Sequence, residues 1–165
     1  MTGSSLLPLV QGRQAARRDR VFLERERHAN VRKNDSSYPV RAVRTRDFLY
    51  IRNLRPDRWP AGDPEVYFSV GPFGDIDGGP TKSLLLERRT DPAIEKFFEL
   101  ATAKRSAEEL YDLRKDPAEV RNLAADPAHR EVLERMRAEM AKFRSETHDP
   151  WLPGQATVFG HEEEH

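Results

Sequence analysis

The sequence contains no cysteine, which excludes disulfide bridges, cysteine-ligated zinc and thiol nucleophiles. It also has no apolar run of about 18 residues, the length that a membrane-spanning helix needs, so we expect no membrane partner. Lysine is scarce, since only 6 of the 28 basic residues are lysine and 22 are arginine. Guanidinium groups suit forked binding of sulfate, phosphate or carboxylate, although genome composition explains such a bias equally well.

Acidic and basic residues cancel over the whole chain but are unevenly placed. Residues 1–60 hold 14 basic and 6 acidic side chains, and the remainder holds 14 basic and 22 acidic ones. We expect these two parts to attract each other or to have separate functions. The basic part has no interleaved aromatic residues and no recognisable nucleic-acid module, so we expect no nucleic-acid partner.

The strand predictions rest on short apolar segments between polar loops. Val21–Leu23 is one such segment. A β-hairpin is predicted from Tyr38–Arg44 and Asp47–Leu54, which are joined at Thr45-Arg46. A further strand is predicted from Glu108–Leu113. The proline- and glycine-rich stretch 55–80 predicts a long excursion without regular structure.

The helix predictions rest on apolar spacing and on Asp-Pro caps. Thr81–Arg89 and Pro92–Ala103 are expected to form helices that cover a sheet. Asp116-Pro117 is expected to begin a short helix, and Asp126-Pro127 the longest one, which ends near Thr147. The fold class is therefore α+β, with a small antiparallel sheet of three or four strands backed by helices. We expect a linker over 1–20, a folded unit over 21–151 and a flexible tail over 152–165.

Two short patterns imitate catalytic motifs. His161–His165 spells H-E-x-x-H, a zinc pattern, but it lies in the expected tail and no third ligand follows, so a solvated tail is the interpretation. Ser37–Arg41 fits S-x-P-x-R, the core around which some sulfatases convert serine or cysteine to formylglycine. Here the pattern continues into the predicted hairpin, so the start of an edge strand is the interpretation.

Three polar segments remain as candidates for binding. Glu24–His28 ends the first predicted strand, and His28 there is able to hydrogen-bond an anionic or sugar oxygen, with surface decoration as the equal alternative. Asp75–Gly79 resembles part of a calcium loop but lacks the spacing of the other ligands, which favours a turn. Asn34–Ser36 is a formal glycosylation sequon in a polar loop.

A longer pattern carries a family resemblance. Residues 108–124 are similar to the E-L-Y-D-L-x-x-D-P-x-E-x-x-N-L-A signature near the carboxyl end of formylglycine-dependent sulfatases. Gly3–Leu9 resembles the G-x-S-L-L-P-L segment that joins the catalytic part of those enzymes to their C-terminal subdomain. Ser37–Val43 and Glu146–Trp151 resemble the heparan N-sulfatase (sulfamidase) branch in particular.

This resemblance implies a C-terminal sulfatase subdomain, from a parent fold of the alkaline-phosphatase-like type. The formylglycine, the calcium ligands and the groups that handle the sulfate ester precede the resembled part, so it implies no catalytic residue, metal site or cofactor in this chain. It implies a missing N-terminal catalytic domain and a sulfated sugar as partners, and a chain inactive by itself. By resemblance His28 is the first choice for contact with sugar or sulfate, and Arg27 and Arg41 are further choices.

The rival hypothesis is a stand-alone module that binds sulfated glycans through its arginine-rich part. Its affinity would fall as salt rises, because screening weakens exposed charge contacts. The sequence assigns no cellular compartment.

Overall fold

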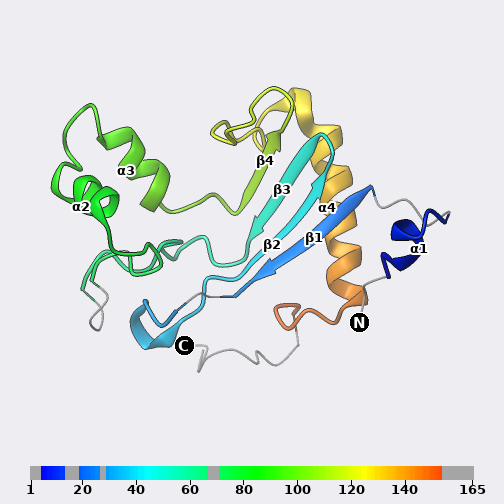
Figure 1. Cartoon of the computed structure of the whole chain (residues 1–165), viewed down its shortest axis with the longest axis horizontal. Coiled ribbons are helices and arrows are strands. Elements are labelled where there is room, and N and C mark those ends of the chain that lie inside the picture. Colours follow the sequence, from blue (N-terminus) through cyan, green and yellow to red (C-terminus); the bar gives the residue numbers. More distant parts are fainter. Residues whose placement is uncertain (1–4, 14–18, 27–28, 67–70, 154–165) are drawn as a thin grey trace.

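The computed structural model describes residues 5–13, 19–26, 29–66 and 71–153. Within them a four-stranded antiparallel sheet has one long helix across one face (Figure 1). The strands are β1 (Arg20–Arg25), β2 (Val40–Thr45), β3 (Phe48–Asn53) and β4 (Glu108–Asp112). The helices are α1 (Leu7–Val10), α2 (Pro80–Glu87), α3 (Glu95–Thr102) and α4 (Arg130–Glu146), with short 3₁₀ turns at Lys33–Asp35 and Pro127–His129. The α+β prediction is confirmed, as are all four predicted strands.

The strands pair in sequence order, β1-β2-β3-β4. Because residues directly opposite one another share a face, the register divides the sheet into two surfaces. One surface carries Phe22, Val43, Tyr50 and Leu110 and is covered by α4. The other, called the open face here, carries the following residues of the four strands: Val21, Leu23, Arg25, Val40, Ala42, Arg44, Leu49, Ile51, Asn53, Glu109 and Tyr111.

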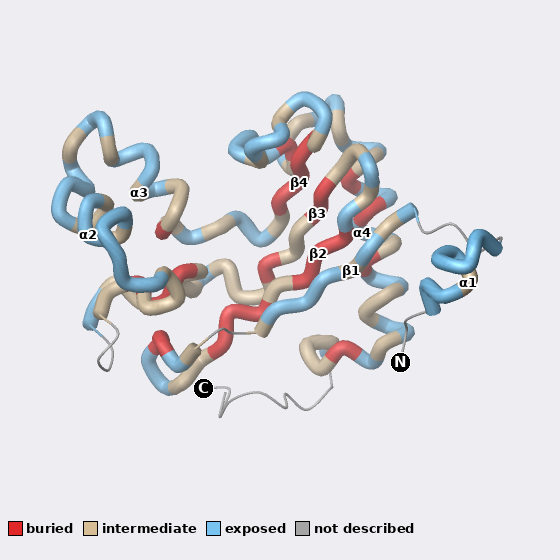
Figure 2. The backbone as a smooth tube through the Cα atoms, viewed as in Figure 1, coloured by how far each residue is buried: buried red, intermediate tan, exposed pale blue. Residues whose placement is uncertain are grey.

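The main core lies between the sheet and α4. The apolar stripe predicted on this helix faces inward, with Leu133, Met136 and Met140 buried and Phe143 stacked on Phe22 at a ring-centroid distance of 4.1 Å. Figure 2 shows the buried residues concentrated on the central strands, whereas α1 and α2 are exposed. The Asp-Pro pattern caps the 3₁₀ turn Pro127–His129 that leads directly into α4, because the Asp126 carboxylate accepts the backbone N–H of Ala128 at 3.0 Å.

The polar side of α4 is only partly solvated. Arg137 donates two hydrogen bonds to Glu108 of β4, and Glu139 pairs with Arg20 of β1. Arg144 bonds to Asp149, whereas Arg130 and Glu134 are exposed. The helix is therefore held at its middle and its C-terminal end by ion pairs as well as by its apolar stripe.

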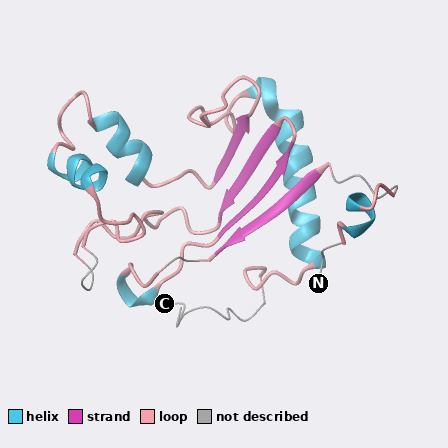
Figure 3. Ribbon diagram, viewed as in Figure 1, coloured by secondary structure: helices cyan, strands magenta, loops and turns pink. Residues whose placement is uncertain are grey.

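The prediction that α2 and α3 cover the sheet is wrong. They lie beside it, beyond β4 and next to the long loop that follows β3 (Figures 1 and 3). The reason is that α3 directs Phe98 toward Phe73 of that loop, with ring centroids 5.8 Å apart, while Phe97 points outward and is 58% exposed. The open face is thereby left without a helical layer.

The helix predicted at Asp116-Pro117 is also wrong, since 113–124 form turns. The Asp116 carboxylate does accept backbone N–H groups, from Val120 and Arg121 at 2.9 and 2.7 Å. However, Glu119 adopts a positive φ of 54°, and Asn122 bonds to the backbone of Leu110. These contacts hold the segment against the edge of β4, whereas a helix at this point would carry the chain away from that edge.

The terminal segments include little regular structure. Leu7–Val10 forms one helical turn, and its apolar side chains are largely exposed. The predicted linker and flexible tail stay predictions, and the H-E-x-x-H pattern at His161–His165 lies outside the described residues. No described helix has the length and apolar character needed to cross a membrane.

Candidate functional site

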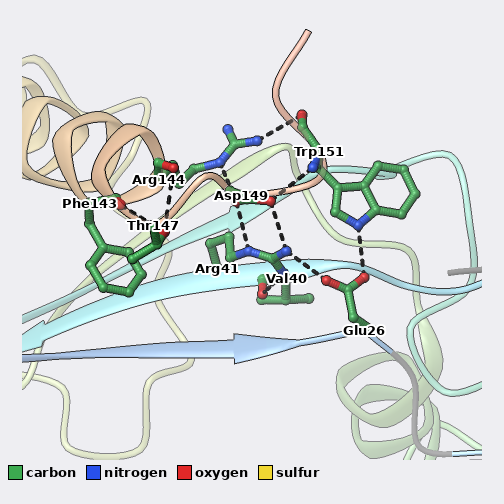
Figure 4. Close-up of polar contacts among 8 residues, drawn as sticks. All are labelled: Glu26, Val40, Arg41, Phe143, Arg144, Thr147, Asp149 and Trp151. Carbon is green, nitrogen blue, oxygen red and sulfur yellow. Dashed lines mark hydrogen bonds and ion pairs between the residues drawn. The ribbon is translucent and has the colours of Figure 1, made fainter. Parts of the chain in front are cut away.

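The predicted binding segment follows β1, which ends at Arg25. Arg27 and His28 lie outside the described residues, so their contact with sugar or sulfate stays a prediction. Their neighbour Glu26 is described, and it belongs to a network of charged groups that connects β1, β2 and the end of α4 (Figure 4). The structure therefore fixes the point from which the 27–28 segment departs.

Arg41 of β2 lies at the centre of this network, and its side chain is 1% exposed. Its Nε and Nη2 atoms donate to the Asp149 carboxylate at 2.9 and 3.0 Å, a forked arrangement, and Nη2 also donates to Glu26 Oε1 at 2.6 Å. Nη1 donates to the carbonyl of Val40 at 3.0 Å. All of these partners belong to the chain itself. The contact of Arg41 with substrate stays a prediction, and it requires this network to open.

A local feature at the end of α4 puts Asp149 within reach of Arg41. Thr147 ends the helix and His148 adopts a left-handed φ of 53°. The backbone N–H groups of His148 and Asp149 then bond to the carbonyls of Ser145 and Arg144, the Schellman pattern of a helix end. This reversal turns the Asp149 side chain toward Arg41, as Figure 4 shows.

Asp149 receives hydrogen bonds from three residues. Besides Arg41, Arg144 donates at 2.7 Å and the Trp151 backbone N–H at 2.9 Å. Burial alone would raise the pKa of the Asp149 carboxyl, but the bonds from Arg41, Trp151 and Arg144 outweigh it and hold the pKa below its ordinary value. The carboxylate is therefore charged at neutral pH and neutralises the buried guanidinium.

Trp151 completes the network from the far end. Its indole N–H donates to Glu26 Oε2 at 2.8 Å, and Arg144 donates to its carbonyl at 2.9 Å. The indole is therefore docked at the end of β1. Glu26 is thus held by Arg41 on one oxygen and by Trp151 on the other, and it anchors the chain immediately before Arg27.

A second cluster attaches the long loop to the segment after β1. Arg32, 1% exposed, donates to the carbonyls of Trp59 and Pro60 and to the Asp75 carboxylate at 2.9 Å. Arg25 donates to Pro60 and to the same oxygen of Asp75 at 3.3 Å. Burial lowers the pKa of Arg32 despite its bond to Asp75. Asp75, part of the calcium-like stretch, is thus a partner of two arginines, which agrees with the turn interpretation.

The other sequence candidates have structural roles where they are described. Ser37 is 1% exposed and leads into β2, as the strand interpretation of S-x-P-x-R expects. Asn34 of the sequon lies exposed in a 3₁₀ turn with a φ of 59°. Sequence reasoning identified Arg41 but missed its partners Glu26 and Asp149, because the three residues come from different parts of the chain.

Among the described residues, no group of three or more His, Asp or Glu side chains is arranged to hold a metal ion. The serine of the S-x-P-x-R stretch is buried, and Arg58 donates to its backbone carbonyl at 2.7 Å. The two networks of hydrogen bonds and ion pairs hold the end of β1 beside the end of α4 and the long loop.

The comparisons with known proteins agree on one enzyme class. No protein-family model matches the chain. It is 33% identical over 154 residues to the N-sulphoglucosamine sulphohydrolase of Homo sapiens, and 29% identical over 140 residues to an ulvan-active sulfatase of Formosa agariphila. Among solved structures, a 2-O GAG sulfatase matches with a TM-score of 0.52 and 20% identity over 91% of this chain.

The matches cover most of this chain and a small part of each relative. The human and the Formosa agariphila relatives match 92% and 85% of this chain, whereas the chain spans only 28% and 24% of their own lengths. It covers 21% of the solved sulfatase. The resemblance read from residues 108–124 is thereby confirmed. The chain is a homologue of the sulfatases, and its extent and fold are consistent with a C-terminal part of such an enzyme.

Proposed function

We propose that this chain is the C-terminal subdomain of a sulfatase, which completes the fold and the substrate pocket of a catalytic part encoded outside this sequence. The proposal rests on the extent of the sequence match. Almost the whole chain is matched by its human relative, but the chain spans only 28% of that protein. The complete enzyme would hydrolyse sulfate esters or N-sulfated amino sugars. Its formylglycine and calcium would belong to the catalytic part.

The open face supports a partner of this kind. Val21 and Leu23 of β1 are 49% and 50% exposed on that face. Apolar side chains of the first helical turn are also exposed, and α1 lies on the β1 side of the sheet (Figure 1). Exposed apolar groups gathered in one region are typical of a surface that another domain covers. We therefore place the catalytic part against β1 and α1.

The substrate-facing segment of the proposal is the chain after Glu26. His28 remains the first choice for contact with sugar or sulfate, and Arg27 the second. The bonds from Arg41 and Trp151 to Glu26 support this choice, because they fix the base of the segment. Arg41 would act on substrate chiefly by holding Glu26 in place.

The rival, a stand-alone glycan-binding module, needs arginines that are free to bind sulfate. Several arginines of residues 1–60 instead pair with acidic residues of the remainder of the chain. This pairing also accounts for the uneven distribution of charge along the sequence. These pairs are Arg20–Glu139, Arg25–Asp75, Arg32–Asp75, Arg41–Asp149, Arg44–Glu119 and Arg52–Glu108. This internal pairing favours the subdomain over the module.

A chimeric enzyme tests the proposal. The chain would replace the matched segment of the human sulphohydrolase, and sulfate release from N-sulfoglucosamine would be measured. We expect the chimera to turn over substrate and the chain alone to release no sulfate. Leu23→Asp should reduce the chimera's activity by placing a charge in the apolar contact. Phe97→Asp, at an equally exposed position on α3, serves as the matched control and should not.

Two results would contradict the proposal. One is sustained sulfate release by the purified chain alone that disappears on substitution of one of its own side chains. The other is tight, saturable and salt-sensitive binding of sulfated oligosaccharides by the chain, combined with an inactive chimera. The second result would favour the stand-alone module.

A further inference from the structure

A cavity of about 540 Å³ lies between the long loop and the helices α2 and α3. Its volume is within the range of small-ligand sites. Figure 1 shows α2 and α3 beyond β4, far from α1 and from the end of α4. The cavity is therefore separate from the network around Arg41 and from the surface that we assign to the catalytic part.

The walls of the cavity are mainly aromatic and apolar. Trp59 and Phe73 belong to the long loop, and Phe98 belongs to α3. The ring centroid of Phe73 lies 6.0 Å from that of Trp59 and 5.8 Å from that of Phe98, and both pairs meet edge to face. Further apolar walls come from Pro64, Pro72 and Leu86. Walls made of flat rings favour a ligand that also carries a flat ring, because aromatic groups attract one another through dispersion and their quadrupoles.

The backbone of Phe73 holds its ring in the cavity wall. Phe73 is 5% exposed and has a left-handed φ of 50°, a conformation that is unfavourable for a residue with a Cβ atom. The Phe73 N–H donates to the Asp63 carbonyl at 2.8 Å, and Lys82 Nζ donates to the Phe73 carbonyl at 3.1 Å. These bonds maintain the unusual conformation, so the aromatic wall is in place before a ligand arrives. A preformed wall lowers the cost of ordering on binding.

Two cations border the cavity, one after each helix. Lys104 follows α3, and its Nζ atom lies 5.2 Å from the centroid of the Trp59 ring. Arg89 follows α2 and donates from Nη1 to the carbonyl of Leu86 at 3.1 Å. Among the described residues, neither cation has a carboxylate within ion-pair distance. Glu99 carries the opposing charge in the described lining, so the net charge there is positive and favours an anionic ligand.

We infer that this cavity binds a small aromatic carboxylate, with its ring among the three aromatic side chains and its carboxylate beside Lys104 and Arg89. The ring would leave water for the apolar walls, and the carboxylate would stay at the edge, where the cations and solvent both reach it. A neutral ring compound would leave both cations without an anion. An aliphatic acid would lose the contacts between rings. The described residues form this site by themselves, so binding requires no catalytic part.

Calorimetric titration of the complete chain with three probes tests the inference. Phenylbutyrate carries both the ring and the carboxylate, phenylbutanol has the ring without the charge, and hexanoate has the charge without the ring. We expect phenylbutyrate to bind more tightly than either of the other probes. Its affinity should fall as salt rises, because screening weakens contacts between exposed charges, whereas the affinity of phenylbutanol should not fall.

Two variants test the two halves of the site. Lys104→Gln removes an exposed charge and should weaken phenylbutyrate binding about fivefold while leaving phenylbutanol binding unchanged. Ala103→Leu enlarges a half-buried residue of the cavity wall and should weaken the binding of both ring compounds. Lys96→Gln is the matched control, because Lys96 is exposed on α3 but does not border the cavity. We expect it to bind every probe as the unmodified chain does.

Tryptophan fluorescence locates the bound ligand. The chain has two tryptophans, Trp59 in the cavity wall and Trp151 in the network at the end of α4. Phenylbutyrate should change the tryptophan emission of the unmodified chain. Trp59→Phe keeps a ring in the wall but removes the reporting indole, so this change should disappear while the emission of Trp151 remains.

Absence of phenylbutyrate binding would overturn the inference. Equally tight binding of phenylbutanol or hexanoate would do the same, since the ring and the charge are both required. So would equal effects of Lys104→Gln and Lys96→Gln, or an emission change that persists in Trp59→Phe. Sulfate release by the chimera enters none of these measurements, so this site and the subdomain proposal fail separately.

Discussion

Arg41 and Asp149 lie 108 residues apart in the sequence and form a forked ion pair in which both side chains are 1% exposed. The pair joins the second strand of the sheet to the segment that follows the last helix. Buried charges are stable only when they are paired and hydrogen-bonded, and here Glu26, Arg144 and Trp151 supply the remaining bonds. The stability of the folded chain therefore depends on this network.

Asp149→Ala should destabilise the chain strongly. The substitution leaves the Arg41 guanidinium buried beside Glu26 alone, and such a loss typically costs about 3–5 kcal/mol. Urea unfolding, followed by circular dichroism, measures the change. Arg130→Ala is the control, because Arg130 is 80% exposed and its pair with Glu134 is long; we expect a change of about 0.5 kcal/mol or less. Equal effects of the two substitutions would contradict the structural role of the pair.

Stability should fall in acid. The pKa of Glu108 is lowered by its bonds from Arg137 and Tyr50, and that of Asp149 is lowered as described above. A carboxyl with a lower pKa in the folded state binds protons more readily after unfolding, so its contribution is complete at neutral pH and is lost as the pH falls below about 4. Thermal unfolding between pH 7 and pH 3 measures this loss. Asp149→Ala should show a shallower decrease than the unmodified chain.

Met136→Ala should cost about 2–5 kcal/mol, since Met136 is 1% exposed between α4 and the sheet and its truncation opens a cavity. Phe97→Ala removes a larger side chain from α3, but Phe97 is 58% exposed, so we expect a much smaller loss. Denaturant unfolding of both variants gives the comparison. A greater loss at Phe97 would contradict the assignment of the main core to the space between α4 and the sheet.

Gly62→Ala should disturb the long loop. Gly62 has a φ of 95°, and an added Cβ would lie 2.9 Å from the Gly74 nitrogen and 3.0 Å from Val31 Cγ2. Gly71→Ala is the matched control, because Gly71 also has a positive φ but an added Cβ would meet no atom of the described residues within 4 Å. We expect about 1 kcal/mol for the control, from the backbone alone, and a larger loss at Gly62. Thermal unfolding of the two variants measures the difference.

Much of the fold follows from local signals in the sequence. Alternation predicts β2 and β3 as a hairpin, and apolar spacing with an Asp-Pro cap predicts α4 close to its observed bounds. Local signals failed at Asp116, where the same Asp-Pro pattern forms a turn. There the deciding contact is Asn122 with β4, which no local pattern encodes.

The functional residues were harder to predict than the strands. Arg41 was chosen for its chemistry, but its partner Asp149 comes from the other end of the chain. Glu26, which accepts from both Arg41 and Trp151, was not identified as their partner, because Trp151 lies 125 residues away in the sequence.

The position of Asp149 also has a consequence for synthesis of the chain. The ribosome synthesises Arg41 long before Asp149, which neutralises it. Until the last helix has emerged, enclosing that guanidinium in the sheet therefore costs free energy that no paired carboxylate offsets. A stop codon that removes Asp149 would leave the same charge permanently uncompensated. We therefore expect premature products of this gene to be degraded as misfolded protein even when all four strands and most of α4 have been translated.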